Sequence, residues 1–483
     1  MHKYQMKYPY NILYPFGGGI ILTLIAFFIS RPTANTDIYV QLLAIKGVTS
    51  GLDFSGVGRH PLGIVSVASL FKLLKLDPLI CLYFLQPILS GLCFWILFRL
   101  LITVMPDKHA FFISFSSLSS LVFIKAMNQM TAEIISLFSI LLLMTYVWEN
   151  FIQNHHLSVK TVSFMVILSW IAILFRHTAI FIIIGILIFF YINNIFSKIK
   201  IFLIGTIMLL PGALKTLFFY NEPIYREKIF SLSMPKDFFI QLTKHFLNFT
   251  EIILPYSLHL DHLPWIKLFI VSGCLLILIL LKKYQKDSGE TEYNNRILLA
   301  NYFFTIGCSY YCILSFAAVY YDYDWGELYR VSGYGIIFML SAFWIYTSSF
   351  VKWSKYVLVI LILSSMTKVS YGLRYEILSN QHRFLFQDYR QSVKEIIEYI
   401  NTEDVTEDVY VYTDKSGYGR NLHHMLSYYD LIHSLPFDIN VYSNSIKQSS
   451  IILCSDLDLD QFNASIYRIN KIPGIEGVYA IKK

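Results

Sequence analysis

An acidic residue and a basic pair near the start of the chain lie beside long apolar stretches. Asp37 follows the first apolar run by a few residues, and Arg59 and His60 come about twenty residues later, directly before Pro61. A carboxylate can accept a proton from a hydroxyl group. Arginine and histidine can hold a negatively charged phosphate. The spacing therefore indicates a segment that could combine a proton acceptor with an anion-binding pair.

Each of these residues also has an explanation that involves no chemistry. Asp37 could cap the short helix expected over 38–46, although Thr36 could cap it equally well. Arg59 and His60 could be interfacial side chains that extend toward water from an apolar surface. The sequence leaves both explanations open.

Three further candidates lie where later apolar runs begin or end. Glu133 opens one run, and an ionisable group at the start of a membrane span is a site hypothesis by default. The helix dipole also favours a carboxylate in a first turn, so a purely structural role is the alternative. Arg176 and His177 separate two apolar runs. A polar turn explains this second pair as well as a binding role does.

A polar and aromatic loop at 320–330 contains the last candidates. Arg330 opens the next apolar run, and the guanidinium fork suits a phosphate. The alternative is an interfacial aromatic belt, including Tyr329, with an anchoring arginine. Asp322 and Asp324 could hold a divalent cation beside a phosphate, although such short pairs also arise by chance in polar loops.

The composition predicts that membrane-spanning helices position these residues. Hydrophobic residues make up 55% of the chain and charged residues 15%, against about 25% charged in a typical soluble domain. The mean hydropathy is +0.53. Such a composition excludes a disordered chain, a fibrous protein and a small disulfide scaffold. No part of the sequence shows the basic stripe of a nucleic-acid binder. We therefore expect a multi-pass membrane protein that binds no nucleic acid.

Apolar runs of about the length that crosses a bilayer predict an α-helical protein with about eleven transmembrane helices. The runs lie near 12–30, 79–104, 110–126, 130–149, 161–176, 178–195, 201–219, 264–281, 297–320, 331–351 and 356–371. One further run, 61–76, is short and carries two lysines. If it lies along the outer surface, the basic loops all fall on one side, as the positive-inside rule requires. We therefore expect a cytoplasmic N-terminus and an outer C-terminus in the plasma (inner) membrane.

The charge balance divides the chain at residue 371. Residues 372–483 hold 11 Lys and Arg against 15 Asp and Glu, and 1–371 hold the remaining 28 of 39 and 17 of 32. We expect a transmembrane domain over 1–371, with outer loops at 31–78, 220–263 and 320–330, and a soluble extracytoplasmic α/β domain over 372–483. The second domain is predicted to contain helices over 388–401 and 422–432 and strands over 409–413, 439–442, 451–454 and 477–481.

With Asp37 beyond the first span and His60-Pro61-Leu62-Gly63 before the short run, the chain resembles the polyprenyl-phosphate-sugar-dependent glycosyltransferases of the GT-C fold. Protein O-mannosyltransferases and lipid A aminoarabinose transferases are examples. In those families an Asp or Asp-Glu pair follows the first span, and a (Lys/His)-Pro-Pro-like motif opens a juxtamembrane helix. This chain departs from the pattern in having one acidic residue and one proline.

The resemblance implies transfer of a sugar from a polyprenyl-phosphate donor to a glycan, lipid or protein acceptor on the outer face. Asp37 would be the general base, and Arg59, His60 and Arg330 would hold the donor phosphate. The donor would be a co-substrate from the surrounding membrane lipids, with a divalent cation as an optional addition. The remaining candidates for substrate binding are Tyr39, Glu133, Arg176, His177 and Tyr329.

Two other functions stay open. A transporter or flippase of lipid-linked sugars would show paired repeats, broken helices and charges in mid-span, whereas the candidates here lie at span ends. A polysaccharide polymerase or ligase would keep key arginines in a large mid-chain outer loop. Arg226 in the 220–263 loop keeps that function possible.

Overall fold

The structure of the protein is a computed structural model. It describes residues 10–30, 45, 48–49, 62–119, 121–128, 132–154, 158–219, 237–247, 265–267, 269, 272, 291–320, 328–348, 354–380, 386–402, 409–412, 435–437, 451–455, 468–472 and 478–482.

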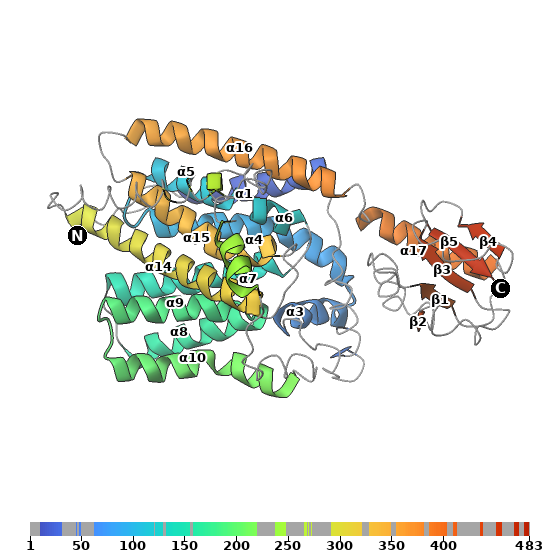
Figure 1. Ribbon diagram of the computed structural model, residues 1–483, viewed down its shortest axis with the longest axis horizontal. Helices are drawn as coiled ribbons and strands as arrows, with labels where there is room; N and C mark the ends of the chain where they lie inside the picture. Colours follow the sequence, from blue (N-terminus) through green and yellow to red (C-terminus); the bar gives the residue numbers. More distant parts are fainter. Residues whose placement is uncertain are drawn as a thin grey trace.

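Long apolar helices form the larger part of the molecule, and a small sheet lies beyond one end of them (Figure 1). The helices are α1 (Tyr10–Ser30), α3 (Leu62–Leu73), α4 (Pro78–Leu101), α5 (Asp107–Leu118), α6 (Leu121–Asn128), α7 (Glu133–Val147), the π-helix η2 (Trp148–Gln153), α8 (Val159–Phe175), α9 (Ala179–Ile192), α10 (Lys198–Phe219), α12 (Phe238–Leu247), α14 (Thr291–Tyr320), α15 (Leu328–Ser348), α16 (Ser354–Asn380) and α17 (Phe386–Thr402).

Within the described residues, three helices are long and apolar enough to cross a membrane. They cover Pro78–Leu101, Glu133–Gln153 and Asn294–Ala317, and several shorter apolar helices accompany them. Most predicted runs coincide with helices, but the total of eleven spans stays a prediction. The run 264–281 lies mostly outside the described residues. Helix α16 continues past residue 371, the predicted end of the transmembrane domain, to Asn380.

One predicted span is broken in two. The run 110–126 was expected to be a single helix, but α5 ends at Leu118 and α6 begins at Leu121. Ser119 follows α5 outside the regular helical conformation. Serine side chains compete for backbone hydrogen bonds and weaken a helix interior. The four serines between residues 116 and 120 explain why the hydropathy of this run is continuous while the helix is not.

Close backbone contacts hold neighbouring helices together. In α14 and α15, a Cβ atom added to Gly307 would lie 2.9 Å from the Gly335 carbonyl oxygen. In α1 and α4, a Cβ atom on Gly19 would lie 2.8 Å from the Gly91 Cα. Small residues permit such approach, which is how helices gain packing energy in a lipid environment. These four glycines therefore fix the spacing of two helix pairs.

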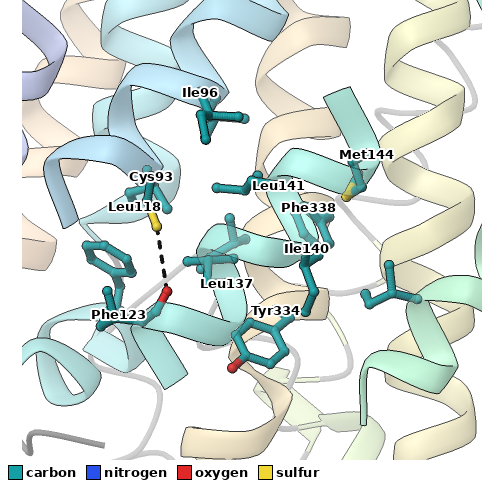
Figure 2. Packing of buried hydrophobic residues seen from close by; sticks show 14 of the residues in the cluster. Cys93, Ile96, Leu118, Phe123, Leu137, Ile140, Leu141, Met144, Tyr334 and Phe338 are labelled. Carbon is teal, nitrogen blue, oxygen red and sulfur yellow. Dashed lines mark hydrogen bonds between the residues drawn. The ribbon is translucent and has the colours of Figure 1, made fainter. Parts of the chain in front are cut away.

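The centre of the bundle is packed with large apolar side chains. Figure 2 shows Ile96 of α4, Leu137 and Leu141 of α7 and Phe338 of α15 converging in this region. All four are at most 2% exposed. The core therefore joins helices that lie far apart in the sequence, and α7 runs through its middle.

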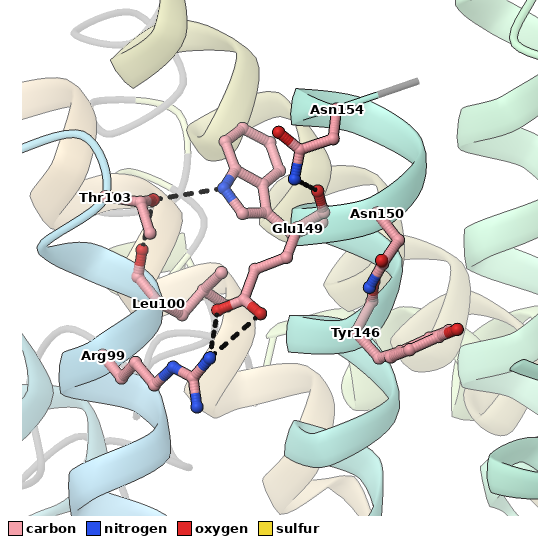
Figure 3. A network of polar contacts seen from close by, with 8 residues as sticks. Arg99, Leu100, Thr103, Tyr146, Glu149, Asn150 and Asn154 are labelled. Carbon is pink, nitrogen blue, oxygen red and sulfur yellow. Dashed lines mark hydrogen bonds and ion pairs between the residues drawn. The ribbon is translucent and has the colours of Figure 1, made fainter. Parts of the chain in front are cut away.

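Helix α7 begins at Glu133 and continues into the π-helix that contains Glu149. We call the two ends of the bundle the Glu133 end and the Glu149 end. At the Glu149 end, the Arg99 guanidinium lies 3.0 Å from the Glu149 carboxylate, and the Trp148 indole N–H donates to the Thr103 hydroxyl at 3.1 Å (Figure 3). Polar contacts thus tie the end of α4 to the end of α7.

A lysine lies buried inside the bundle, near the break between α5 and α6. Lys368 of α16 is 3% exposed. Its ammonium donates to the Ser116 carbonyl at 3.3 Å and to the Ser116 hydroxyl at 3.4 Å. Ser116 lies in the last turn of α5, where carbonyl groups lack helical partners and carry a partial negative charge. The lysine therefore caps the broken helix.

The C-terminal part contains a five-stranded sheet in the order β2-β1-β3-β5-β4. The strands are β1 (Val409–Tyr412), β2 (Leu435–Phe437), β3 (Ile451–Ser455), β4 (Arg468–Lys471) and β5 (Val478–Lys482). Strand β1 is parallel to β2 and β3, whereas β5 is antiparallel to β3 and β4. Three of the four predicted strands coincide with β1, β3 and β5, and neither β2 nor β4 was predicted.

The remaining predictions for this part differ in outcome. The predicted helix over 388–401 is α17, and Ile396 on its apolar face is fully buried. The Asn470 side-chain amide donates to the Tyr399 hydroxyl at 3.4 Å, which joins α17 to β4. The strand predicted at 439–442 and the helix at 422–432 lie outside the described residues. The division into two domains at residue 371 stays a prediction.

Candidate functional site

A buried ion pair lies at the Glu133 end of the bundle. The Arg176 guanidinium donates to the Glu133 carboxylate. Glu133 is the first residue of α7, and Arg176 directly follows the last residue of α8. The side chains are 4% and 12% exposed, respectively. The pair therefore joins two helix ends with opposite charges that water hardly reaches.

The surroundings keep both groups charged. Burial disfavours the charged form of each group, whereas the opposite charge within hydrogen-bond distance favours it. Removing either member would leave the other as an isolated charge in a region of low dielectric constant. Such buried charges at helix ends are typical of functional sites, although they also occur in purely structural roles.

Two tyrosines complete this cluster. The Tyr334 hydroxyl donates to the backbone carbonyl of Glu133 at 3.0 Å, and the Arg176 guanidinium lies 5.9 Å from the centre of the Tyr334 ring. The ring of Tyr310 packs edge-on against Tyr334, with 5.8 Å between centroids. We define Glu133, Arg176, Tyr310 and Tyr334 as the Glu133 cluster. It brings α7, α14, α15 and the turn between α8 and α9 to one point.

The start of α3 lies beside this cluster. A Cβ atom on Gly63, the second residue of α3, would lie 2.6 Å from the Phe175 ring. Phe175 directly precedes Arg176. Helix α3 itself ends before Lys75, whose φ of 60° is left-handed. The predicted helix over 61–76 is therefore shorter than expected, and its first turn contacts the end of α8.

The structure describes only some of the residues predicted from the sequence. It brings Glu133 and Arg176 together and confirms a turn after α8, which contains His177. Arg330 and Tyr329 belong to the first turn of α15, but their side chains are not described. Six predicted residues lie outside the described part of the chain: Asp37, Tyr39, Arg59, His60, Asp322 and Asp324.

The sequence analysis missed three residues that the structure brings forward. Tyr310 and Tyr334 lie inside apolar runs, where a tyrosine gives no distinctive signal. Lys368 did carry a signal, because a charged residue within an apolar span is rare and usually functional or paired. The predicted topology placed Glu133 and Arg176 at the same face of the membrane with opposite charges, but it did not indicate that these two residues pair with each other.

No group of three or more His, Cys, Asp or Glu side chains among the described residues could hold a metal ion. The aspartate pair at 322 and 324 lies outside this search. A divalent cation therefore stays a prediction.

Comparison with known proteins gives a likeness in structure only. No protein-family model matches the sequence, and no curated protein matches it. The structure of ArnT from Cupriavidus metallidurans bound to undecaprenyl phosphate is similar over 97% of both chains, with a TM-score of 0.51 and 11% identity. The apo state of the same protein gives a TM-score of 0.45 at 10% identity, over 96% of this chain and 98% of that one.

An oligosaccharyltransferase from Archaeoglobus fulgidus, crystallised with Zn and sulfate, is also similar. It gives a TM-score of 0.48 at 11% identity, over 91% of this chain and 68% of its own. Of these three structures, the undecaprenyl-phosphate-bound one has the highest TM-score, and the similarity covers 97% of both chains. The protein therefore has the GT-C fold that Asp37 and the His60–Gly63 motif led us to expect.

Proposed function

We propose that this protein is a membrane glycosyltransferase that moves a sugar from a polyprenyl-phosphate donor to an acceptor hydroxyl. One observation carries the proposal: a GT-C fold over the whole chain has a buried charged cluster at one end, beside the first turn of α3. The similar ArnT structure holds undecaprenyl phosphate. In this sequence, His60 comes only three residues before Gly63, which contacts the end of α8.

The reaction needs a base and an anion-binding group. The acceptor oxygen would attack the anomeric carbon while the bond from that carbon to the phosphate oxygen breaks. Asp37 would take the hydroxyl proton, and polyprenyl phosphate would leave. Arg59, His60 and Arg330 would stabilise the charge that develops on the departing phosphate. The acceptor would be a glycan, a lipid or a protein.

The substitution Asp37→Asn tests this assignment. Asparagine caps a helix about as well as aspartate, so the variant should fold normally. It lacks the proton acceptor, and turnover should fall by a factor on the order of 10²–10⁴. The assay uses the purified protein in liposomes with lipid-linked sugars and acceptors extracted from the source membranes. Release of polyprenyl phosphate is followed by mass spectrometry.

Asp77→Asn is a matched control. Asp77 accepts hydrogen bonds from the Leu79 and Ile80 backbone N–H groups at the start of α4, and asparagine can accept them as well. This control should retain full turnover. Full activity of Asp37→Asn would refute the catalytic role. In that case Asp37→Ala should cost about 1 kcal/mol of stability, as expected for a simple helix cap.

The same assay separates the alternative functions. A transporter would move the lipid-linked sugar across the bilayer without releasing polyprenyl phosphate. A polymerase or ligase that depends on the 220–263 loop would lose activity in Arg226→Ala and keep it in Arg330→Ala. The glycosyltransferase proposed here should show the opposite pattern.

The proposal also includes an orientation, with the Glu133 end and the C-terminal domain outside the cytoplasm. Helix α16 leads from the Glu149 end to the Glu133 end and then to α17 (Figure 1). A reporter fused after Ser379 should behave as exported. A cytoplasmic signal from this fusion would contradict the site, because the donor was placed on the outer face.

A further inference from the structure

Tyr334 is held by a hydrogen bond in addition to its packing in the core. It is 3% exposed, and its hydroxyl donates to the Glu133 carbonyl at 3.0 Å. This carbonyl belongs to the first residue of α7 and has a second lone pair available beyond the helical hydrogen bond. The bond therefore links α15 to α7 without disrupting α7.

Two further sets of contacts fix α15 at Tyr334 and at the next residue. The Arg176 guanidinium, fixed by Glu133, lies 5.9 Å from the Tyr334 ring centre. A Cβ atom on Gly335, the next residue, would lie 3.0 Å from both the Gly307 carbonyl oxygen and the Tyr310 ring. Helix α15 thus has no room to approach α14 further at this level.

Tyr334 lies about one helical turn from Arg330, the residue predicted to bind the donor phosphate. Arg330 precedes Tyr334 by four residues on α15, and residues at this spacing share one face of a helix. The part of α15 that precedes Tyr334 spans residues 328–333. Fixing Tyr334 therefore restricts the direction in which this short first segment can extend.

We propose that Tyr334, anchored by Glu133 and Arg176, is a positioning residue that fixes the first turns of α15 and thereby sets the place of Arg330. This inference rests on the proposed function, in which Arg330 holds the donor phosphate. Tyr334 does not touch the donor; it acts through Arg330. Tyr334→Phe removes one hydroxyl and keeps the ring that packs against Arg176 and Tyr310.

The chain offers a matched control at the Glu149 end of the same helix bundle. The Tyr302 hydroxyl of α14 donates to the Met144 backbone carbonyl of α7 at 3.2 Å, and Tyr302 is fully buried. Tyr302→Phe therefore removes the same kind of bond to the same helix, far from Arg330. Both variants should remain folded.

The first measurement is hydrogen–deuterium exchange of the intact protein in detergent. Amide exchange over residues 328–334 should rise at least about threefold in Tyr334→Phe and stay unchanged in Tyr302→Phe, because the lost hydrogen bond lies at this segment in the first variant and far from it in the second. Unchanged exchange in Tyr334→Phe would overturn the proposal, whatever the donor turns out to be.

The second measurement is a double-mutant cycle on the affinity for undecaprenyl phosphate. Tyr334→Phe should weaken binding about fivefold to tenfold when Arg330 is present, the effect of about one hydrogen bond. In the Arg330→Ala background the same change should have an effect of less than about twofold. A purely structural tyrosine would weaken binding equally in both backgrounds, and that result would refute the positioning role.

The two measurements distinguish this inference from the proposed function. If the unmodified protein fails to bind undecaprenyl phosphate, the proposed donor is wrong and Arg330 has no phosphate to hold. If the unmodified protein binds it and the cycle shows no coupling, the donor assignment stands and the role of Tyr334 is wrong.

Discussion

The continuous helix formed by α7 and η2 carries an arginine–glutamate ion pair at each end, and the two pairs differ in their access to water. At the Glu133 end, the Arg176 and Glu133 side chains are 12% and 4% exposed. At the Glu149 end, the Arg99 and Glu149 side chains are 41% and 27% exposed. The chemical groups are the same, but their surroundings differ in dielectric constant. Their interaction energies must therefore differ as well.

The difference in burial favours a functional role for the Glu133 pair and a structural role for the Glu149 pair. At the Glu149 end, the partly exposed ion pair adds to the hydrogen bond between Trp148 and Thr103 (Figure 3). At the Glu133 end, desolvation of two charges opposes folding, and apolar residues of similar volume would often be at least as stable. A buried ion pair at this position therefore favours a functional role for Glu133 and Arg176. The backbone bond from Tyr334 and the start of α3 add to this interpretation.

The largest predicted effect comes from breaking the buried pair. Arg176→Met leaves the Glu133 carboxylate buried without its guanidinium, and the free energy of unfolding should fall by about 3–5 kcal/mol. Arg99→Met removes a half-exposed partner that water can replace, so the loss should be about 0–1 kcal/mol. Chemical denaturation in detergent micelles measures both.

A double variant tests the cause of this difference. Glu133→Gln combined with Arg176→Met removes both charges and should recover a large part of the stability lost in Arg176→Met alone. Equal losses for Arg176→Met and Arg99→Met would show that burial does not distinguish the two ends.

A smaller effect is predicted between the two ends, at the break after α5. Lys368→Glu places a carboxylate beside the Ser116 carbonyl at the negative end of the α5 dipole, and stability should fall by about 2 kcal/mol. Lys368→Met keeps the length of the side chain and removes a charge that is costly to bury, so little stability should be lost.

Denaturation in the same micelles compares these two variants. Equal damage from methionine and glutamate would mean that the ammonium bonds to Ser116, rather than the sign of the charge, hold the broken helix.

The smallest effect is predicted for a third ion pair, on the surface of α17. The Lys394 and Glu398 side chains are 68% and 64% exposed and lie 3.7 Å apart, one turn from each other. Lys394→Met should change stability by no more than about 0.5 kcal/mol, and added salt should remove most of that difference. A loss as large as that of Arg176→Met would break the relation between burial and energy on which the comparison rests.

Local patterns in the sequence account for the helices and for the expected fold. Apolar runs predicted α1, α4, α7 and most later helices, because the membrane requires about twenty apolar residues for each crossing. The helical spacing of isoleucines predicted the buried face of α17. The acidic residue and the proline motif after the first apolar run predicted the GT-C fold, which the structural comparison supports over 97% of the chain.

The same patterns failed where neighbours in space decide the outcome. The break at Ser119 falls within a run of continuous hydropathy, and Lys368, which caps it, lies 252 residues away from Ser116. Strand β4 gave no signal in sequence, and its place depends on pairing with β5 at the sheet edge. Hydropathy describes each residue separately, so it cannot report which helix end receives a hydrogen bond from a distant helix.

The sequence by itself determined that this chain is a membrane protein and that charged residues lie at the ends of its spans. Only the tertiary structure decided that Glu133 pairs with Arg176, 43 residues away, and that Tyr334 bonds to Glu133 across 201 residues. The physical reason is that composition and periodicity fix which residues leave water, whereas the partners of a buried polar group depend on how the helices pack.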